Sequence, residues 1–135
     1  MNKGYLLDTN ICIYLLKRKY DIAKRLDGLA MSRLCISEIT LAELYYGASK
    51  SNRKEEQMKD IHLIASLFEV LPISSSLELY GDNKFTLERE GNRIDDFDLL
   101  IGSTAVKHNL VLVTENIKHL CRVPNIKIEN WIKRE

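Results

Sequence analysis

Acidic and amide side chains stand at four separate points of this chain, each at the edge of an apolar segment. They are Asp8, Glu43, Asp98 and the pair Glu115-Asn116. A buried carboxylate is costly unless it is paired or bound to a metal. A fold that gathers several of these groups at one end of a sheet therefore builds a site for a divalent cation.

The donor types indicate which cation would bind. A carboxylate cluster without thiols or paired histidines favours hard cations, Mg²⁺ or Mn²⁺. Such ions activate water and neutralise the charge that develops on a phosphodiester, often as a pair. The chain has no P-loop glycine pattern and no Ser or Cys nucleophile beside a recognisable base, which argues against nucleotide-driven and covalent chemistry.

Two of the acids also have simpler structural interpretations. Asp8 follows an apolar run and precedes Thr9, so it is an equally good N-cap for a helix. Asn10 is either a supporting residue of the site or a turn residue. Glu43 lies in a helix that is apolar nearly all round, where a lone acid is unusual if buried and ordinary if it meets water. Gly47, one turn on, would clear space above its carboxylate.

Three aspartates, Asp95, Asp96 and Asp98, crowd the start of one predicted helix. Capping and the helix dipole account for acids there, each stabilising by about 0.3–1 kcal/mol, but three exceed what one cap needs and repel one another without a cation. Asp98 shares a helix face with Ile101 and Ala105 and so points toward the sheet. This leaves Asp95 and Asp96 as the better cap candidates.

Glu115 and Asn116 follow the very apolar run 110–113, where the simple interpretation is a turn with an N-cap. In a metal site, Asn116 would instead offer a neutral oxygen or position a water. Thr114 would then hydrogen-bond a carboxylate that binds the metal.

Short apolar runs and helical periodicity predict strands that alternate with helices. The predicted strands are 4–7, 34–36, 69–71, 110–113 and 126–128. The predicted helices are 9–18, 21–29, 39–49 with Ser37 as N-cap, 53–68, 76–90, one from Asp95 or Asp96 to residue 108, a helical turn at 117–121 and a terminal turn at 130–134. This alternation implies an α/β fold, an α/β/α sandwich around a mainly parallel sheet. Ligands of such sheets bind at the carboxyl ends of the strands, where Asp8 and Glu115-Asn116 lie.

Composition predicts one domain that spans residues 1–135, with 45% hydrophobic and 29% charged residues. The net charge of +1 gives no large field that would attract polyanions. A nucleic acid would have to be held by local basic groups beside the acidic site, and His119 is expected at the edge of that site. The candidates for phosphate contacts are Lys17-Arg18-Lys19, Arg89, Arg93, Lys118, Arg122 and Lys133-Arg134.

Cysteine usage and the N-terminus favour a cytoplasmic protein without a membrane anchor. Cys12 and Cys35 lie in apolar runs and are expected to be small buried hydrophobes, and the three cysteines form no zinc-like pattern. A reducing cytoplasm fits this usage best. The opening MNKGYLLDTN is too briefly apolar for a signal peptide or a membrane span.

The chain resembles the PIN-domain ribonucleases, and specifically the VapC-type toxins of bacterial toxin–antitoxin pairs. The resemblance covers nearly the whole chain, and its motifs occur in the right order and spacing. They read LLDTNICIYLLK around Asp8, ISEITLAELYYGA around Glu43, IDDFDLLIGSTAVKHN around Asp98, LVLVTENIKHL around Asn116 and IKIENWI around Trp131.

The resemblance implies a Mg²⁺- or Mn²⁺-dependent endoribonuclease that inhibits translation by cutting structured RNA, often a tRNA and including initiator tRNA. Carried over by position, Asp8, Glu43 and Asp98 form the acidic core, with Asp8 and Asp98 as the principal metal ligands. Glu43 would orient the attacking water, and in-line attack would leave 5′-phosphate and 3′-hydroxyl ends.

The sequence departs from the family pattern in two of its motifs. Asn116 stands where many PIN domains have aspartate, which lowers the negative charge of the site by one and weakens the case for a second metal ion. The usual G-P-F-D before the third acid reads D-D-F-D here. Asp95 or Asp96 would therefore add negative charge around the site. The residues expected to support the three acids are Asn116, Thr114, Asn10 and Asp96.

Partners also follow from the resemblance. Family members typically form homodimers and are silenced by a VapB-like antitoxin that inserts a segment near the acidic pocket. The homodimer and the antitoxin would then assemble into a larger hetero-oligomer. The amphipathic helix 53–68 would pack on the core, on a second subunit or on the antitoxin, and periodicity does not decide between these.

Two other functions compete with this one. A catalytically silent PIN-like module that binds RNA or protein would keep the fold without cleavage. A receiver domain of signalling proteins also places acids and Mg²⁺ on a parallel sheet, but it needs paired acids after the first strand and an aspartate after the third. Here the first strand is followed by one acid and the third by Pro72-Ile73-Ser74, which argues against it.

Overall fold

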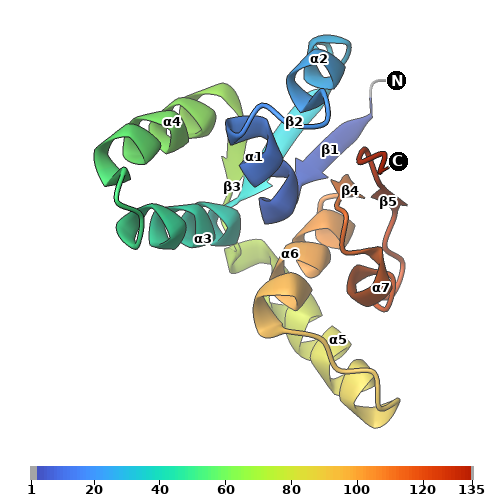
Figure 1. The fold of residues 1–135 in the computed structure, drawn as a ribbon. Coiled ribbons are helices and arrows are strands. Elements are labelled where there is room, and N and C mark those ends of the chain that lie inside the picture. The colour runs from blue at the N-terminus through green and yellow to red at the C-terminus, as the bar shows by residue number, and fades with distance from the viewer. Residues whose placement is uncertain (1–2, 135) are drawn as a thin grey trace.

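A five-stranded sheet forms the centre of the computed structural model, which describes residues 3–134 (Figure 1). The strands are β1 (Gly4–Leu7), β2 (Arg33–Ser37), β3 (Glu69–Leu71), β4 (Val111–Val113) and β5 (Ile128–Glu129). The helices are α1 (Thr9–Leu16), α2 (Ile22–Asp27), α3 (Glu38–Ser49), α4 (Lys54–Leu67), α5 (Leu77–Arg89), α6 (Asp96–Lys107) and α7 (Ile117–Leu120), with a 3₁₀ turn η1 (Ser74–Ser76) before α5. The predicted α/β architecture is confirmed.

All strand pairs are parallel, and their order across the sheet is β3-β2-β1-β4-β5. The chain builds outward from β1 through β2 to β3 and then returns to place β4 on the other side of β1. The carboxyl ends of β1 and β4 are therefore neighbours at the point where the strand order reverses, which is where open α/β sheets bind ligands. Asp8 follows one of these strands and Thr114 follows the other.

Alternating side chains of the strands feed two separate hydrophobic clusters, one on each face of the sheet. Leu7 packs on the face covered by α1 to α4, with Ile11, Leu44 and Ile61. Leu6 packs on the opposite face, in the cluster that α5, α6 and α7 cover. The two groups of helices stand on opposite sides of the sheet in Figure 1, as expected of an α/β/α sandwich.

Several predicted elements end earlier than the sequence pattern indicates. The helix predicted for 9–18 ends at Leu16, because Arg18, Tyr20 and Asp21 have φ angles of 54–57°, which a right-handed helix does not allow. The helix predicted for 21–29 is correspondingly shortened to Ile22–Asp27. The predicted N-cap is confirmed, since Ser37 Oγ accepts a hydrogen bond from the Ile39 amide at 3.0 Å.

The C-terminal segment differs from the prediction. The fifth strand is Ile128–Glu129 rather than 126–128, because these two residues stand in register with Leu112 and Val113 of β4. The Leu112 and Thr114 amides donate to the Lys127 and Glu129 carbonyls. The terminal turn predicted for 130–134 is wrong, since this stretch has no regular structure. It is fixed instead by Trp131 and Ile132, which are buried in the hydrophobic cluster beside α1 and α2.

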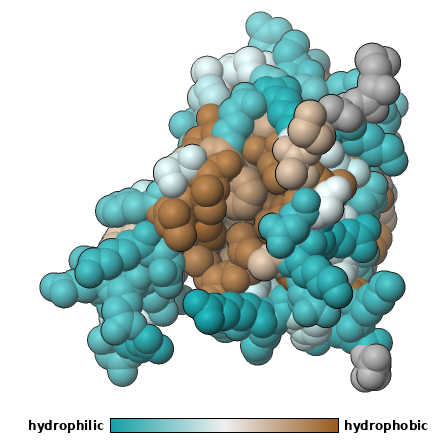
Figure 2. All heavy atoms as spheres, turned by 90° about the horizontal axis from the view of Figure 1, so that it is seen from above, coloured by the Kyte–Doolittle hydropathy of each residue, from teal (hydrophilic) through white to brown (hydrophobic). Residues whose placement is uncertain are grey.

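The surface combines charged side chains with a local concentration of hydrophobic ones. Figure 2 shows hydrophobic side chains together near the middle of the face seen from above, with hydrophilic ones around them. Cys12 and Cys35 are buried, as predicted, whereas Cys121 is exposed. Among residues 3–134, no helix is both long enough and apolar enough to cross a membrane.

Candidate active site

Asp8 is a buried carboxyl group at the carboxyl end of β1, with 3% of its surface exposed. It accepts hydrogen bonds from the Thr9 amide at 2.8 Å, from Thr114 Oγ1 at 2.7 Å and from Asn10 Nδ2 at 3.4 Å. Burial raises its pKa, and these hydrogen bonds act in the opposite direction. Asp8 is thus the N-cap of α1, as one interpretation predicted, and also a carboxylate held rigidly at the switch point of the sheet.

Thr114 connects the ends of the two neighbouring strands. Its hydroxyl donates to Asp8 across the sheet, and the same oxygen accepts the Asn116 amide at 3.0 Å. The predicted hydrogen bond from Thr114 to a carboxylate is therefore present. Asn10 reinforces the connection, because its side-chain oxygen accepts the Glu115 amide at 3.2 Å.

Glu43 reaches the same region from α3 and is half-buried. Its carboxylate accepts a hydrogen bond from Thr9 Oγ1 at 2.7 Å, and Thr9 Oγ1 also lies 3.0 Å from the hydroxyl of the buried Thr40. Burial raises the pKa of Glu43, and so do the negative charges of Asp8 and Asp95. A side chain added at Gly47 would meet nothing within 4 Å, so the helix face beyond Glu43 is open, as predicted.

Thr9 is a candidate residue that the sequence pattern did not single out. It directly follows Asp8 and begins α1, so its amide binds one acid while its hydroxyl binds another. The sequence signal that could have identified Thr9 is a hydroxyl residue immediately after the aspartate that ends a strand.

Asp98 approaches from the first turn of α6 and is also half-buried. Its pKa is raised to about 6, first by burial and then by the negative charges of Asp8, Asp95 and Glu43. The predicted acidic residues from three distant parts of the chain are thus close enough to interact electrostatically. Asn116 joins them by donating from Nδ2 to Asp98 Oδ2 at 3.3 Å.

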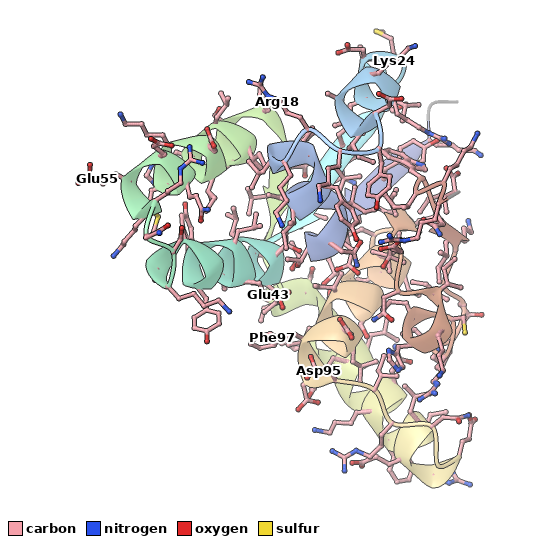
Figure 3. All side chains as sticks on the ribbon, viewed as in Figure 1. Arg18, Lys24, Glu43, Glu55, Asp95 and Phe97 are labelled. Carbon is pink, nitrogen blue, oxygen red and sulfur yellow. The ribbon has the colours of Figure 1, made fainter. Side chains whose placement is uncertain are left out.

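Of the two neighbouring aspartates, Asp95 is confirmed as a helix cap, whereas Asp96 does not take the supporting place at the site that the sequence suggested. Asp96 faces away, toward α5, where it accepts from Tyr80 at 2.9 Å and pairs with Lys84 at 3.0 Å. Asp95 is the N-cap of α6, and its charge is the one that acts on Asp98 and Glu43. Figure 3 shows Asp95 and Glu43 on adjacent parts of α6 and α3. Local spacing could not distinguish the two aspartates, because both satisfy the rules for a helix start.

Glu115 also turns away from the acidic residues. Its carboxylate accepts from Tyr14 at 2.7 Å and from Arg134 Nη2 at 2.9 Å, so it fixes the C-terminal segment against α1. Of the polar pair after β4, the structure therefore brings Asn116 to the acidic cluster and assigns Glu115 to a structural contact.

We expect Asp95→Asn to lower the pKa of Asp98, because it removes a negative charge that disfavours ionisation. Asparagine is an equally good N-cap, so α6 should remain intact. Asp96→Asn, made as the matched control, should leave the Asp98 pKa unchanged because that carboxylate pairs with Lys84. A carbon-13 NMR titration of the Asp98 carboxyl measures this pKa in each variant. Equal effects of the two substitutions would contradict the placement of Asp95 near Asp98 and of Asp96 away from it.

The oxygen donors fit a hard cation. Carboxylates that raise one another's pKa are relieved by a positive ion, and Mg²⁺ or Mn²⁺ prefers oxygen ligands. Within residues 3–134, no three carboxylate, imidazole or thiol groups already form a ready ligand set. Mg²⁺ usually needs only one or two carboxylates and keeps several waters, a requirement that Asp8 and Asp98 can meet.

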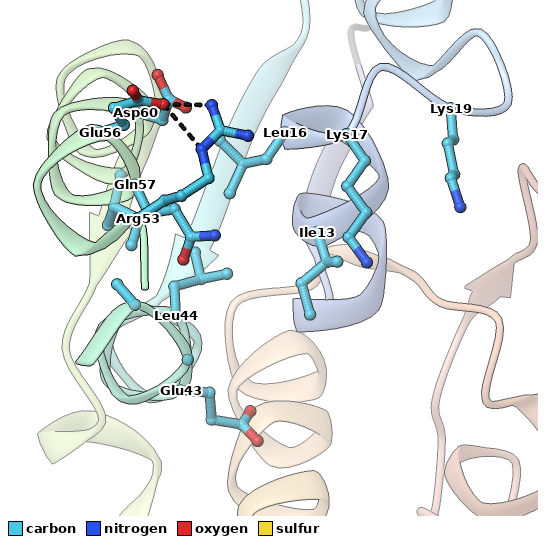
Figure 4. Close-up of a pocket in the computed structure, with 13 residues that line it drawn as sticks. Ile13, Leu16, Lys17, Lys19, Glu43, Leu44, Arg53, Glu56, Gln57 and Asp60 are labelled. Carbon is cyan, nitrogen blue, oxygen red and sulfur yellow. Dashed lines mark hydrogen bonds and ion pairs between the residues drawn. The ribbon is translucent and has the colours of Figure 1, made fainter. Parts of the chain in front are cut away.

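A groove of about 590 Å³ opens beside Glu43, between α1, α3 and α4 (Figure 4). Its wall includes the apolar side chains of Ile13, Leu16, Leu44 and Ile61. Charged groups also line it, and they are Lys17, Lys19, Arg53, Glu56 and Asp60. Helix α4 packs on the core through Ile61 and Ile64. The core is therefore one of the partners of this amphipathic helix, between which periodicity alone did not decide.

Four of the nine predicted phosphate-binding groups already have protein partners. Arg89 stacks over Phe85, and Arg93 pairs with Glu88 at 3.6 Å. Arg122 donates to the Arg93 carbonyl at 3.0 Å, and Arg134 binds Glu115. Lys17 and Lys19, by contrast, line the groove that reaches Glu43, which makes them the better-placed candidates.

The chain is similar to several known proteins over nearly its whole length. The family described as "PIN domain" matches residues 5–126. The chain is 42% identical to Ribonuclease VapC2 of Rickettsia felis, over 96% of this chain and 98% of that protein. It is 37% identical to the tRNA(fMet)-specific endonuclease VapC of Salmonella typhimurium, over 94% of this chain and 97% of that protein. The crystal structure of VapBC2 from Rickettsia felis bound to a DNA fragment from their promoter contains a chain that is 41% identical, with a TM-score of 0.88 over 94% of this chain and 98% of that chain.

Proposed function

This chain belongs to the PIN-domain family, as a relative of the VapC ribonucleases, and from that premise we propose that it is a metal-dependent endoribonuclease toxin. Its substrate is structured RNA, namely a tRNA and, by the name of one relative, initiator tRNA. Cleavage of that tRNA inhibits translation. The observation that carries the proposal is that hydrogen bonds link three acids from separate elements at the switch point of the sheet. Thr9 joins Asp8 to Glu43. Thr114 and Asn116 join Asp8 to Asp98.

The three carboxylates have different roles in the proposed reaction, according to their surroundings. Asp8 and Asp98 would hold Mg²⁺ or Mn²⁺, with Asp8 fixed in place by Thr114 and by the Thr9 amide. When bound, the ion polarises a water and neutralises charge on the scissile phosphodiester. Glu43, held by the Thr9 hydroxyl, orients that water for attack in line with the bond from phosphorus to the 3′ oxygen. The products are a 5′-phosphate and a 3′-hydroxyl.

A VapB-like antitoxin is the proposed protein partner. The solved relative is a complex named VapBC2, and the groove between α1, α3 and α4 offers an apolar wall that ends at Glu43. A segment in this groove would lie directly beside the acidic residues and block RNA. We also propose a homodimer that assembles into a larger complex with the antitoxin, since Tyr46, Phe85 and Phe97 leave aromatic rings exposed for a second subunit.

The test is incubation of the purified, antitoxin-free protein with total tRNA and Mg²⁺ or Mn²⁺, followed by sequencing of the fragments. We expect discrete fragments from one or a few tRNAs, and none when EDTA is present. Retention of tRNA or antitoxin without any cleavage by the folded, metal-supplied protein would favour the silent binding module instead.

A further inference from the structure

His119 is an exposed residue of α7 that contacts the acidic site through one intermediary. Its Nδ1 atom lies 3.0 Å from Asn116 Oδ1. The other end of the same amide, Nδ2, lies 3.3 Å from Asp98 Oδ2. Two hydrogen bonds thus connect a surface imidazole to one of the carboxylates proposed to hold the metal.

The direction of these hydrogen bonds follows from the chemistry of the groups. An ionised carboxylate only accepts, so the NH₂ end of Asn116 must face Asp98. The amide oxygen is then turned toward His119 and needs a donor, which requires the imidazole proton to be on Nδ1. The reverse orientation would set the amide oxygen against the carboxylate, where both groups are acceptors.

The framework around this chain of contacts is fixed. Asn116 precedes α7, but its side chain makes no capping hydrogen bond to the helix, so the amide is free for Asp98 and His119. Helix α7 packs closely on α6 because Gly102 has no side chain. A Cβ atom there would lie 3.0 Å from Val123 Cγ2 and 3.3 Å from Leu120 Cδ1. The elements that carry Asp98 and His119 are therefore held at a set separation.

We infer that His119 is a positioning residue that holds the Asn116 amide with its NH₂ group toward Asp98. Asn116 then serves the site as a hydrogen-bond donor to Asp98 and not as an oxygen ligand of the metal. The Oδ2 atom of Asp98 is fixed by this contact, which sets the direction of Oδ1. The importance of the arrangement for cleavage rests on the proposed function, whereas the arrangement itself does not.

The first test needs no activity. Long-range proton–nitrogen NMR spectra of the metal-free protein at mildly alkaline pH report which imidazole nitrogen carries the proton. We expect the Nδ1–H tautomer for His119 and a shift toward the Nε2–H tautomer in Asn116→Ala. His119→Gln and His62→Ala assign the resonances. An Nε2–H tautomer in the unmodified protein, or no response to Asn116→Ala, would overturn the inference.

The second test is a double-mutant cycle on RNA cleavage. We expect His119→Ala to lower kcat about 3- to 10-fold, the effect of one hydrogen bond, with little change in KM. It should have no further effect in an Asn116→Ala background, because the group through which it acts is absent. His119→Asn should retain most of the activity, since its side-chain amide N–H lies close to the position of Nδ1–H. His62→Ala, at an exposed position of α4, should leave kcat unchanged.

Losses that multiply in the double variant would show that His119 contacts RNA directly, which contradicts a role through Asn116. Failure of the proposed function is distinguishable from this outcome. A protein that cleaves no RNA refutes the nuclease assignment, and the tautomer of His119 then decides the positioning role alone.

Discussion

Asp8→Asn is expected to lower the rate of RNA cleavage by about 1000-fold or more, while the protein remains folded. The substitution keeps the shape of the side chain but removes the negative charge that a divalent cation needs. Burial disfavours the ionised form of Asp8, as its raised pKa indicates, so a neutral amide relieves part of that cost. The amide can still accept the Thr9 hydrogen bond that caps α1.

Parallel measurements of cleavage rate and thermal unfolding of this variant test the prediction. Asp82→Asn, which makes the same chemical change on the exposed face of α5, is the matched control and should cleave at the normal rate. A folded Asp8→Asn protein with near-normal activity would mean that Asp8 is the N-cap of α1 and nothing more.

Asp98→Asn is expected to change metal binding and stability in opposite directions. Because Asp98 is proposed as a direct ligand, its loss should weaken Mn²⁺ binding by about 100-fold or more, since even partners of ligands contribute 10- to 100-fold. The metal-free protein should become more stable by about 1–2 kcal/mol, a moderate gain because Asp98 stays partly exposed to solvent. The introduced amide keeps an oxygen that can accept the hydrogen bond which Asn116 gives to Asp98 in the unmodified protein.

The pH dependence follows from the direction of the pKa shift. Folding raises the pKa of Asp98 from 3.8 to about 6, so the folded state holds this proton more tightly than the unfolded chain does. The stability of the unmodified protein should therefore fall as pH rises from about 4 to about 6, and the advantage of Asp98→Asn should be complete above that range. Denaturant unfolding at several pH values, with and without Mn²⁺, tests both parts. A variant that is less stable than the unmodified protein at pH 7 and still gains stability from Mn²⁺ would refute them.

The elements of this fold were largely predictable because they depend on local patterns. The run Glu69–Leu71, the cap at Ser37 and the helix after Asp95 each need only neighbouring residues to be recognised. The residues 130–134 were not predictable in this way. Trp131 and Ile132 find their place in a cluster built by α1 and α2, far away in sequence.

The same distinction applies to the site. Asp8, Glu43 and Asp98 stand out because acids interrupt apolar segments, and the parallel sheet explains why they meet. The choice between Asp95 and Asp96 depends on Lys84 and Tyr80 across the helix interface, which no local rule includes.

The supporting side chains depend on tertiary contacts in the same way. Thr9 binds an acid 34 residues away, and His119 acts on Asp98 only through Asn116. These contacts join residues on different elements, so they can be identified only from the three-dimensional structure.

Chemical analysis of the ends of the RNA fragments tests the central claim most directly. Cleavage with Mg²⁺ or Mn²⁺ is predicted to leave a 5′-phosphate and a 3′-hydroxyl, because water activated between Asp8, Glu43 and Asp98 attacks the phosphorus. A 2′,3′-cyclic phosphate, formed equally well in EDTA, would contradict the account, since the 2′-hydroxyl of the RNA would then be the nucleophile.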